Sequence, residues 1–306
     1  LVRITTEFLG LQVERRRLQH QQESIRLYEL NSEREQALFE AGRVELSSAA
    51  NAENNVLKAK SQLAQLWEQY RLNVDQFKRL IGYPIDKPAR ISEDAIALAV
   101  PTVDMDSAVQ LTLANRLDLQ TERDRLIDRQ RAIRNAENAL LPDLNLNLEA
   151  GIPSAGSTGW DGLDPDFRGV NYSAGLSFGL PLDREIERLA VRTAQINLER
   201  LQRAFILFRD TLVIDVRAAV RDIDANLFSL DLERRNVVIA QLAVDQIEAD
   251  PDRVGLLETQ NAIEQLQQAQ DGRDSAFRDV QVSILRYLEQ SGQLRVNTDG
   301  TLQLLP

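Results

Sequence analysis

The sequence of 306 residues contains no cysteine and a single histidine, His20. Without cysteine the chain has neither a disulfide framework nor thiolate chemistry. One histidine excludes a histidine metal cluster and a Ser-His-Asp triad within one chain. We expect His20 to lie exposed on a glutamine-rich helical face, and we find no glycine-rich phosphate loop. The sequence therefore predicts a protein that is not an enzyme and that uses no metal or cofactor.

Aromatic residues make up only 5% of the chain, and glycine and proline are few. This composition is typical of a helical, coiled-coil-rich protein and not of a compact α/β enzyme. The sequence also lacks a run of about 20 uninterrupted apolar residues, which a membrane-spanning helix needs. A net charge of −11 argues against a nucleic-acid-binding protein, because such proteins carry a clustered basic face.

The chain repeats one pattern at an offset of 210 residues, since 253 − 43 = 210. An Arg-Val-x-Leu motif begins at Arg43, and a related Arg-Val-Gly-Leu motif begins at Arg253. Downstream, the same offset pairs Asn51-Ala52 with Asn261-Ala262, Ala59 with Ala269, Val74 with Ile284, Phe77 with Tyr287, and Gly82 with Gly292. We interpret this as a duplicated helical hairpin with the motif at its turn.

Apolar residues at helical spacing predict long helices over 6–41, 47–81, 106–141, 183–249 and 255–290. Gly42 marks the first turn, Asp106-Ser107 offers an N-cap, and Pro142 ends the third helix. We therefore divide the chain into a first hairpin (1–83, tip near 42–46), a connector (84–105), a helix (106–142), a strand pair (143–181), a second hairpin (182–292, tip near 249–256) and a polar tail (293–306).

The predicted helix over 183–249 is too long for a compact domain of this size. At 1.5 Å per residue, a helix of about 65 residues is roughly 100 Å long. Its apolar residues follow a 3-4-4 spacing from Phe205 to Leu230. Such a rod must project from the domain, and neighbouring helices must cover its apolar stripe.

Two segments, 144–150 and 172–180, alternate strictly between apolar and polar residues, which indicates two β-strands. Two strands alone are marginally stable, so we expect them to pair with strands of other copies, and closure into a barrel removes the edges. A soluble hairpin that caps a coiled coil is the alternative. The loop between the strands carries Asp161, Asp164 and Asp166, which we interpret as a flexible acidic surface rather than a cation site.

Five short motifs in this order and spacing resemble the TolC-type outer-membrane efflux proteins, and the resemblance covers nearly the whole chain. They are Phe39-Glu40-Ala41-Gly42-Arg43-Val44, Leu80-Ile81-Gly82-Tyr83-Pro84, Ala114-Asn115-Arg116-Leu117-Asp118-Leu119, Leu141-Pro142-Asp143-Leu144 and Gly179-Leu180-Pro181-Leu182. The sequence departs from that family at Leu117, where proline is usual, and at Asp250-Pro251-Asp252, where the first turn has a single glycine.

The resemblance implies a mainly α fold with a small β part. Long antiparallel helical hairpins would form one protomer's share of an α-barrel, and the β-hairpin would contribute to a shared outer-membrane β-barrel. It further implies a homotrimer, a periplasmic adaptor (membrane fusion) protein as partner and, through it, an inner-membrane pump. Family members have a second strand pair, so we expect the chain to be an N-terminally truncated fragment.

The resemblance also assigns candidate functional residues. The adaptor-docking tips would comprise Gly42, Arg43, Val44, Glu45, Leu46, Arg253, Val254, Gly255 and Leu256. The alternative is that this motif only turns the chain. Four acids near the second tip are candidates for a constriction ring that favours cations, or simply a solvated charge run: Asp245, Glu248, Asp250 and Asp252. The barrel lumen would be lined by Asn145, Asn147, Glu149, Ser173 and Ser177.

The sequence thus predicts an outer-membrane channel subunit that conducts cargo passively, with its helices in the periplasm and its barrel in contact with outer-membrane lipid. Two alternatives stay open. One is a soluble periplasmic coiled-coil scaffold without channel activity. The other is a channel whose cargo is protein exported by type I secretion instead of small molecules or metal ions. The sequence leaves the cargo open, because the partner pump selects it.

Overall fold

The computed structural model describes residues 2–92, 98–101, 104–151, 171–180, 183–250, 255–296 and 302–304. The chain divides into two compact units. The first comprises Leu1–Arg116 and Leu212–Pro306, and the second comprises Leu117–Thr211. Within the described ranges, no helix combines the length and apolar character that crossing a bilayer demands.

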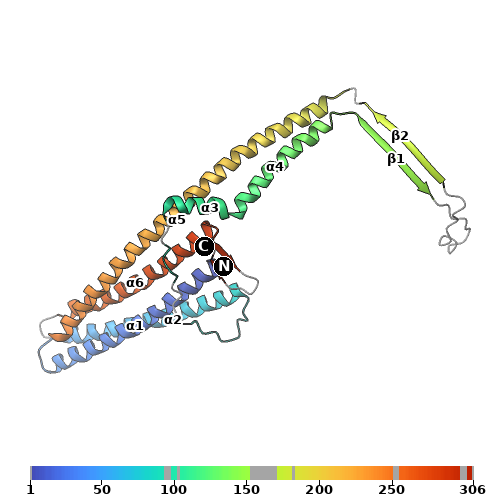
Figure 1. Ribbon diagram of the computed structural model, residues 1–306. Coiled ribbons are helices and arrows are strands. Elements are labelled where there is room, and N and C mark those ends of the chain that lie inside the picture. Colours follow the sequence, from blue (N-terminus) through green and yellow to red (C-terminus); the bar gives the residue numbers. More distant parts are fainter. Residues whose placement is uncertain are drawn as a thin grey trace, which may run out of the picture. The chain divides into compact units, whose positions relative to one another are not determined.

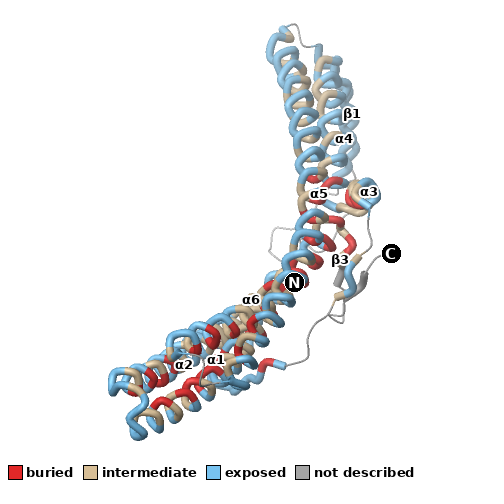
Figure 2. Tube along the Cα trace, turned by 90° about the vertical axis from the view of Figure 1, so that its left-hand side faces the viewer, coloured by how far each residue is buried: buried red, intermediate tan, exposed pale blue. Residues whose placement is uncertain are grey.

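The first unit is built from long antiparallel helices (Figure 1). Helices α1 (Val2–Glu40) and α2 (Leu46–Ile81) form one hairpin, as predicted from their periodicity. Helix α6 (Leu256–Gln290) packs against α1, and it also packs against the part of α5 (Glu185–Ala249) that lies in this unit. Figure 2 shows the buried residues as red stripes along α1, α2 and α6.

The core of the first unit is a chain of small apolar clusters between neighbouring helices, and it has no single centre. Val216 and Ile223 of α5 pack with Ile284 and Tyr287 of α6. Ile25 and Tyr28 of α1, Val56 and Ala59 of α2 and Ile263 of α6 form a second cluster. Helix α2 buries a single stripe, whereas α6, which packs against both α1 and α5, is buried on several faces, because every residue from Val280 to Leu285 is buried.

The predicted duplication is visible in the helix ends. Helix α2 begins after the N-cap Glu45 and ends at Gly82, and α6 begins after Gly255 and ends before Gly292, which preserves the offset of 210. Both terminal glycines have φ +71°. Past them, the N–H of Tyr83 donates to Lys78 O (2.8 Å) and the N–H of Gln293 donates to Leu288 O (3.0 Å). This is the same left-handed helix stop in both repeats.

The helix predicted over 106–141 is divided at Arg116. Helix α3 (Met105–Asn115) begins at the N-cap Asp104, two residues before the predicted cap. Arg116 has extended backbone (φ −71°, ψ 112°), and α4 (Leu117–Asn138) follows at once. The Arg116 guanidinium donates to Gln290 O (3.2 Å), so the end of α6 holds the break in place. Beyond Gly292, where a polar tail was predicted, strands β3 (Leu294–Val296) and β4 (Leu302–Leu304) form an antiparallel pair.

The second unit contains α4, the first part of α5 and a β-hairpin. Strands β1 (Asp143–Gly151) and β2 (Asn171–Gly179) pair antiparallel, drawn as two arrows in Figure 1. Both strands were predicted within one residue at each end. In their register Leu144 lies opposite Phe178, Leu146 opposite Leu176, and Ala150 opposite Tyr172, so the apolar side chains of both strands share one face.

Candidate functional site: the hairpin turns and the β-hairpin

The backbone closes the first turn without help from side chains. Gly42 has φ +71°, where glycine has no steric cost. Its N–H donates to Phe39 O (2.9 Å), and the N–H of Arg43 donates to Leu38 O (2.9 Å). The carbonyls of Leu38 and Phe39 are therefore satisfied by main-chain donors, and the exposed Arg43 side chain is not required for that purpose.

The rest of the first turn also presents side chains to the surface. Val44 is half-buried, whereas Glu45 is exposed and makes no side-chain cap to α2. Its carboxylate accepts instead from the Ser47 hydroxyl (3.1 Å). Leu46, the first helical residue, keeps 63% of its surface exposed. An exposed Arg, Glu and Leu at one turn can contact a partner with both charge and apolar surface.

Only part of the second turn lies within the described residues. Asp252, Arg253 and Val254 lie outside them, so their placement at the tip stays a prediction. Gly255 is the exposed N-cap of α6 at the position of Glu45 in the first repeat, and Leu256 is half-buried. The following Leu257 is 69% exposed, which again puts a large apolar side chain at the tip.

Three of the four candidate constriction acids are described. Asp245, Glu248 and Asp250 are exposed at the end of α5. Asp245 accepts a hydrogen bond from the Gln241 amide (2.8 Å). Across the described ranges, no three His, Cys, Asp or Glu side chains are grouped closely enough to hold a metal ion.

A shallow apolar groove of about 150 Å³ lies close to the tips, between α1, α5 and α6. Leu27 and Leu30 line it from α1, Val244 and Ile247 from α5, and Ile263 from α6. Because it is bordered by helices of both repeats, a change in the packing of the two hairpins would alter its width.

The β-hairpin separates apolar from polar side chains completely. Every described residue of both strands is exposed, with Leu146 at 63% and Leu148 at 72%. The opposite face carries the predicted lumen residues, and the register pairs Asn145 with Ser177 and Glu149 with Ser173. The Ser173 hydroxyl donates weakly to Glu149 Oε2 (3.5 Å). The loop acids Asp161, Asp164 and Asp166 lie outside the described residues.

The sequence did not indicate a partly buried polar contact between α1 and α6. His20 was expected to be exposed, but only 15% of its side chain is. Its Nδ1 lies 2.9 Å from Asp271 Oδ1, and Asp274, on the same helix, is only 3% exposed. The positions are 251 residues apart in the sequence, so periodicity within either helix could not indicate the contact.

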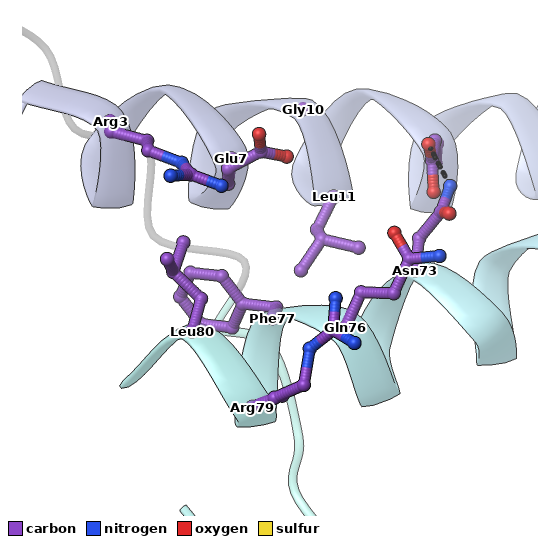
Figure 3. Close-up of a pocket in the computed structure, with 10 residues that line it drawn as sticks. Arg3, Glu7, Gly10, Leu11, Asn73, Gln76, Phe77, Arg79 and Leu80 are labelled. Carbon is purple, nitrogen blue, oxygen red and sulfur yellow. Dashed lines mark hydrogen bonds between the residues drawn. The ribbon is translucent and has the colours of Figure 1, made fainter. Parts of the chain in front are cut away.

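A second, polar groove of about 440 Å³ lies between the first part of α1 and the last part of α2 (Figure 3). Glu7, Gly10 and Leu11 line it from α1, and Gln76 and Phe77 from α2.

Glu14 lies at one end of this groove. Its carboxylate accepts a 2.6 Å hydrogen bond from the Asn73 amide. Burial raises the pKa of Glu14, and the Asn73 hydrogen bond opposes this effect.

Two long helical hairpins related by an internal repeat, together with a small β-hairpin that is apolar on one face, define the TolC-like fold. No protein-family model and no curated relative matches the chain. Solved structures do match. The outer-membrane channel OprN aligns at 16% identity and TM-score 0.78, over 95% of this chain and 65% of that one.

Two further structures give the same result. The outer membrane protein VceC from Vibrio cholerae aligns at 19% identity with a TM-score of 0.75, over 95% of this chain and 70% of that chain. The transmembrane channel CusC aligns at 14% identity with a TM-score of 0.77, over 95% of this chain and 67% of that chain. At these identities the comparisons establish the fold.

Proposed function

We propose that this chain is part of a channel subunit of the outer membrane of a Gram-negative-type cell, with its helices in the periplasm. The observation that carries the proposal is the β-hairpin, whose exposed leucines share one face and whose polar residues share the other. Such a face costs free energy in water and is favourable against lipid. The structures of similar fold are outer-membrane channels, which supports this choice.

The proposal includes a homotrimer, and a second apolar stripe on α5 in the first unit supports its assembly from several copies. Its first stripe, with Val216 and Ile223, is buried against α6. Ile214, Phe228 and Ile239 lie on the opposite face and are 63%, 66% and 66% exposed. Stripes of this kind are normally covered, and further copies of the chain would cover them by completing a tunnel wall.

The proposed mechanism is passive conduction through a polar lumen. The polar face of β1 and β2 carries Asp143 and Glu149 and no basic residue. Rings of carboxylates from several copies would favour cations over anions. The energy would come from an inner-membrane pump. We also propose that the tips bind a periplasmic adaptor and that the adaptor prefers the open packing of the hairpins. Drug, metal-ion and protein cargo are all compatible with such a duct.

Conductance of the full-length protein in a planar lipid bilayer tests the channel. We expect discrete conductance steps with a preference for cations, and Glu149→Lys should weaken or reverse this preference. Glu68→Lys, the same charge change on the exposed surface of α2, should leave the preference unchanged. A full-length protein that stays a stable monomer in water without detergent, and that does not conduct, would favour the scaffold and refute the proposal.

Crosslinking tests the tips. Arg43→Glu combined with Arg253→Glu should abolish crosslinking to the periplasmic adaptor while the oligomer stays intact. Arg71→Glu, a matched charge reversal at an exposed position of α2 away from the turn, should crosslink normally. If the tip variant crosslinks as well as the parent does, the motif only turns the chain.

A further inference from the structure

The contact between α1 and α6 changes character along its length. At one end Leu9 packs with Val282 and Leu285, and toward the tips Ile25 and Tyr28 pack with Ile263. Between these apolar clusters lies a charged group that we call the His20 cluster: Arg16, Arg17 and His20 of α1, and Asp271 and Asp274 of α6. The two repeats therefore meet through ion pairs at the middle of their shared interface.

The His20 cluster places a carboxylate oxygen against each nitrogen of the imidazole. Nδ1 lies 2.9 Å from Asp271 Oδ1, and Nε2 lies 3.6 Å from Asp274 Oδ2. The other oxygen of each aspartate is occupied by arginine. Arg17 Nε is 3.3 Å from Asp271 Oδ2, and Arg16 Nη1 is 3.4 Å from Asp274 Oδ1. Asp274 Oδ2 is buried and has no hydrogen-bond partner among the described residues.

A neutral imidazole cannot satisfy both aspartates. It has one N–H donor, and its other nitrogen presents a lone pair. One carboxylate would then face that lone pair at a site where only 15% of His20 is exposed. The imidazolium ion has two donors and attracts both carboxylates. The geometry is thus fully favourable in the protonated form only.

We propose that His20 is a proton-dependent clamp between the two repeats: its imidazolium bridges Asp271 and Asp274 and holds α1 against α6, and deprotonation loosens this contact. The proposal rests on the proposed function, because it supplies a regulation for the packing of the hairpins that form the tunnel wall. Acidification would stabilise the clamped arrangement, and a rise in pH would favour separation.

The other charges near His20 modulate the clamp without replacing it. Arg273 of α6 also contacts Asp274 (2.9 Å), and Glu264 of α6 lines the adjoining groove. From α5, Glu233 lies against Gly272, and α2 contributes only glutamine amides and Leu66 to that groove. The three arginines repel an imidazolium, but their side chains are 35–55% exposed and solvent screens them.

Spin-label distances across the interface test the clamp. The chain has no cysteine, so Gln22→Cys on α1 and Gln265→Cys on α6, both exposed positions, give one label pair in the full chain. Between pH 5 and pH 8.5, which span the ordinary histidine pKa of about 6.5, we expect the separated population to rise about tenfold. His20→Gln should resemble the high-pH form at every pH, and His20→Arg should stay clamped.

Two outcomes would overturn the clamp. One is a parent distance distribution that does not change with pH, and the other is a pH response that survives in His20→Gln. Circular dichroism of each variant checks that its helices form. The distance measurement does not depend on conductance, so its result is independent of the test of the proposed channel. A protein that conducts but shows no pH-dependent distance refutes only the clamp, whereas a clamp without conductance refutes only the channel.

Discussion

Glycine ends both α2 and α6 in the left-handed conformation, yet the two positions differ in their surroundings. A Cβ on Gly82 would meet no atom within 4 Å, whereas a Cβ on Gly292 would lie 3.1 Å from the Asn115 carbonyl. At Gly82 only the left-handed backbone conformation therefore favours glycine. At Gly292 the close approach of the end of α3 is a second reason for glycine.

This difference predicts unequal effects of alanine. Gly82→Ala should lower the free energy of unfolding by about 1 kcal/mol, the usual cost of a left-handed residue with a Cβ. Gly292→Ala should cost more, because the Asn115 backbone must also move. Denaturant unfolding measures both. Gly10→Ala in α1 is the control and should stabilise by up to about 1 kcal/mol; equal losses at 82 and 292 would contradict the close approach.

Glu14 predicts a pH dependence of stability with a defined sign. Burial raises the pKa of Glu14 in the folded protein. Its favourable contribution is therefore complete below the pKa of the unfolded chain and is lost as the pH rises through the folded pKa. Glu14→Gln keeps an acceptor for Asn73 and removes the charge. We expect a higher melting temperature than the parent at pH 7 and a much smaller difference at about pH 3.5, which is below the ordinary glutamate pKa.

Glu23 on the same helix is the opposite control. Its pKa is lowered, chiefly by the hydrogen bond from Arg26. Glu23→Gln should therefore lower the melting temperature slightly at pH 7, and this difference should vanish as the pH falls through the folded pKa of Glu23. The same sign for both variants would mean that burial does not dominate at Glu14.

The β-hairpin allows a test of which face meets lipid. Under the proposed function, Leu146→Arg places a charge on the lipid side, which costs about 2–4 kcal/mol near the bilayer midplane. Asn147→Arg, one residue along, places the same charge on the polar side and should be tolerated. The yield of folded oligomer in detergent or lipid measures the difference. Equal yields would contradict the assignment of the two faces.

The long helices and strands were predictable because their signals are local. Alternation over 144–150 and helical spacing over 183–249 each reflect one buried or apolar face. This chain has neither glycine nor proline at the Arg116 break, and the Gln290 contact comes from a distant helix, so the proline usual at position 117 in the TolC-type family was a hint that Leu117 concealed. The His20 contact was not predicted because its partner, Asp271, also comes from a helix that is distant in the sequence. The residues of the first turn were found through the repeat.

For the entire protein, the two stripes of α5 predict separate effects on folding and assembly. Ile223 is 5% exposed, so Ile223→Ala should lower the free energy of unfolding by about 2–5 kcal/mol. Phe228 is 66% exposed, so Phe228→Asp should change the unfolding of the monomer by only about 0.5 kcal/mol or less. Under the proposed function, Phe228→Asp should nevertheless abolish assembly, measured by analytical ultracentrifugation. If Phe228→Asp assembles normally, the second stripe of α5 does not form the contact between copies.

The matched helix caps have a consequence for how this architecture can change in length. The terminal glycine follows the N-cap by 82 − 45 = 37 residues in the first repeat and by 292 − 255 = 37 residues in the second, so the capped segments have equal length. Removing seven residues from one of them would shorten it by about 10 Å. Homologues with shorter or longer rods should therefore have gained or lost residues in both repeats together.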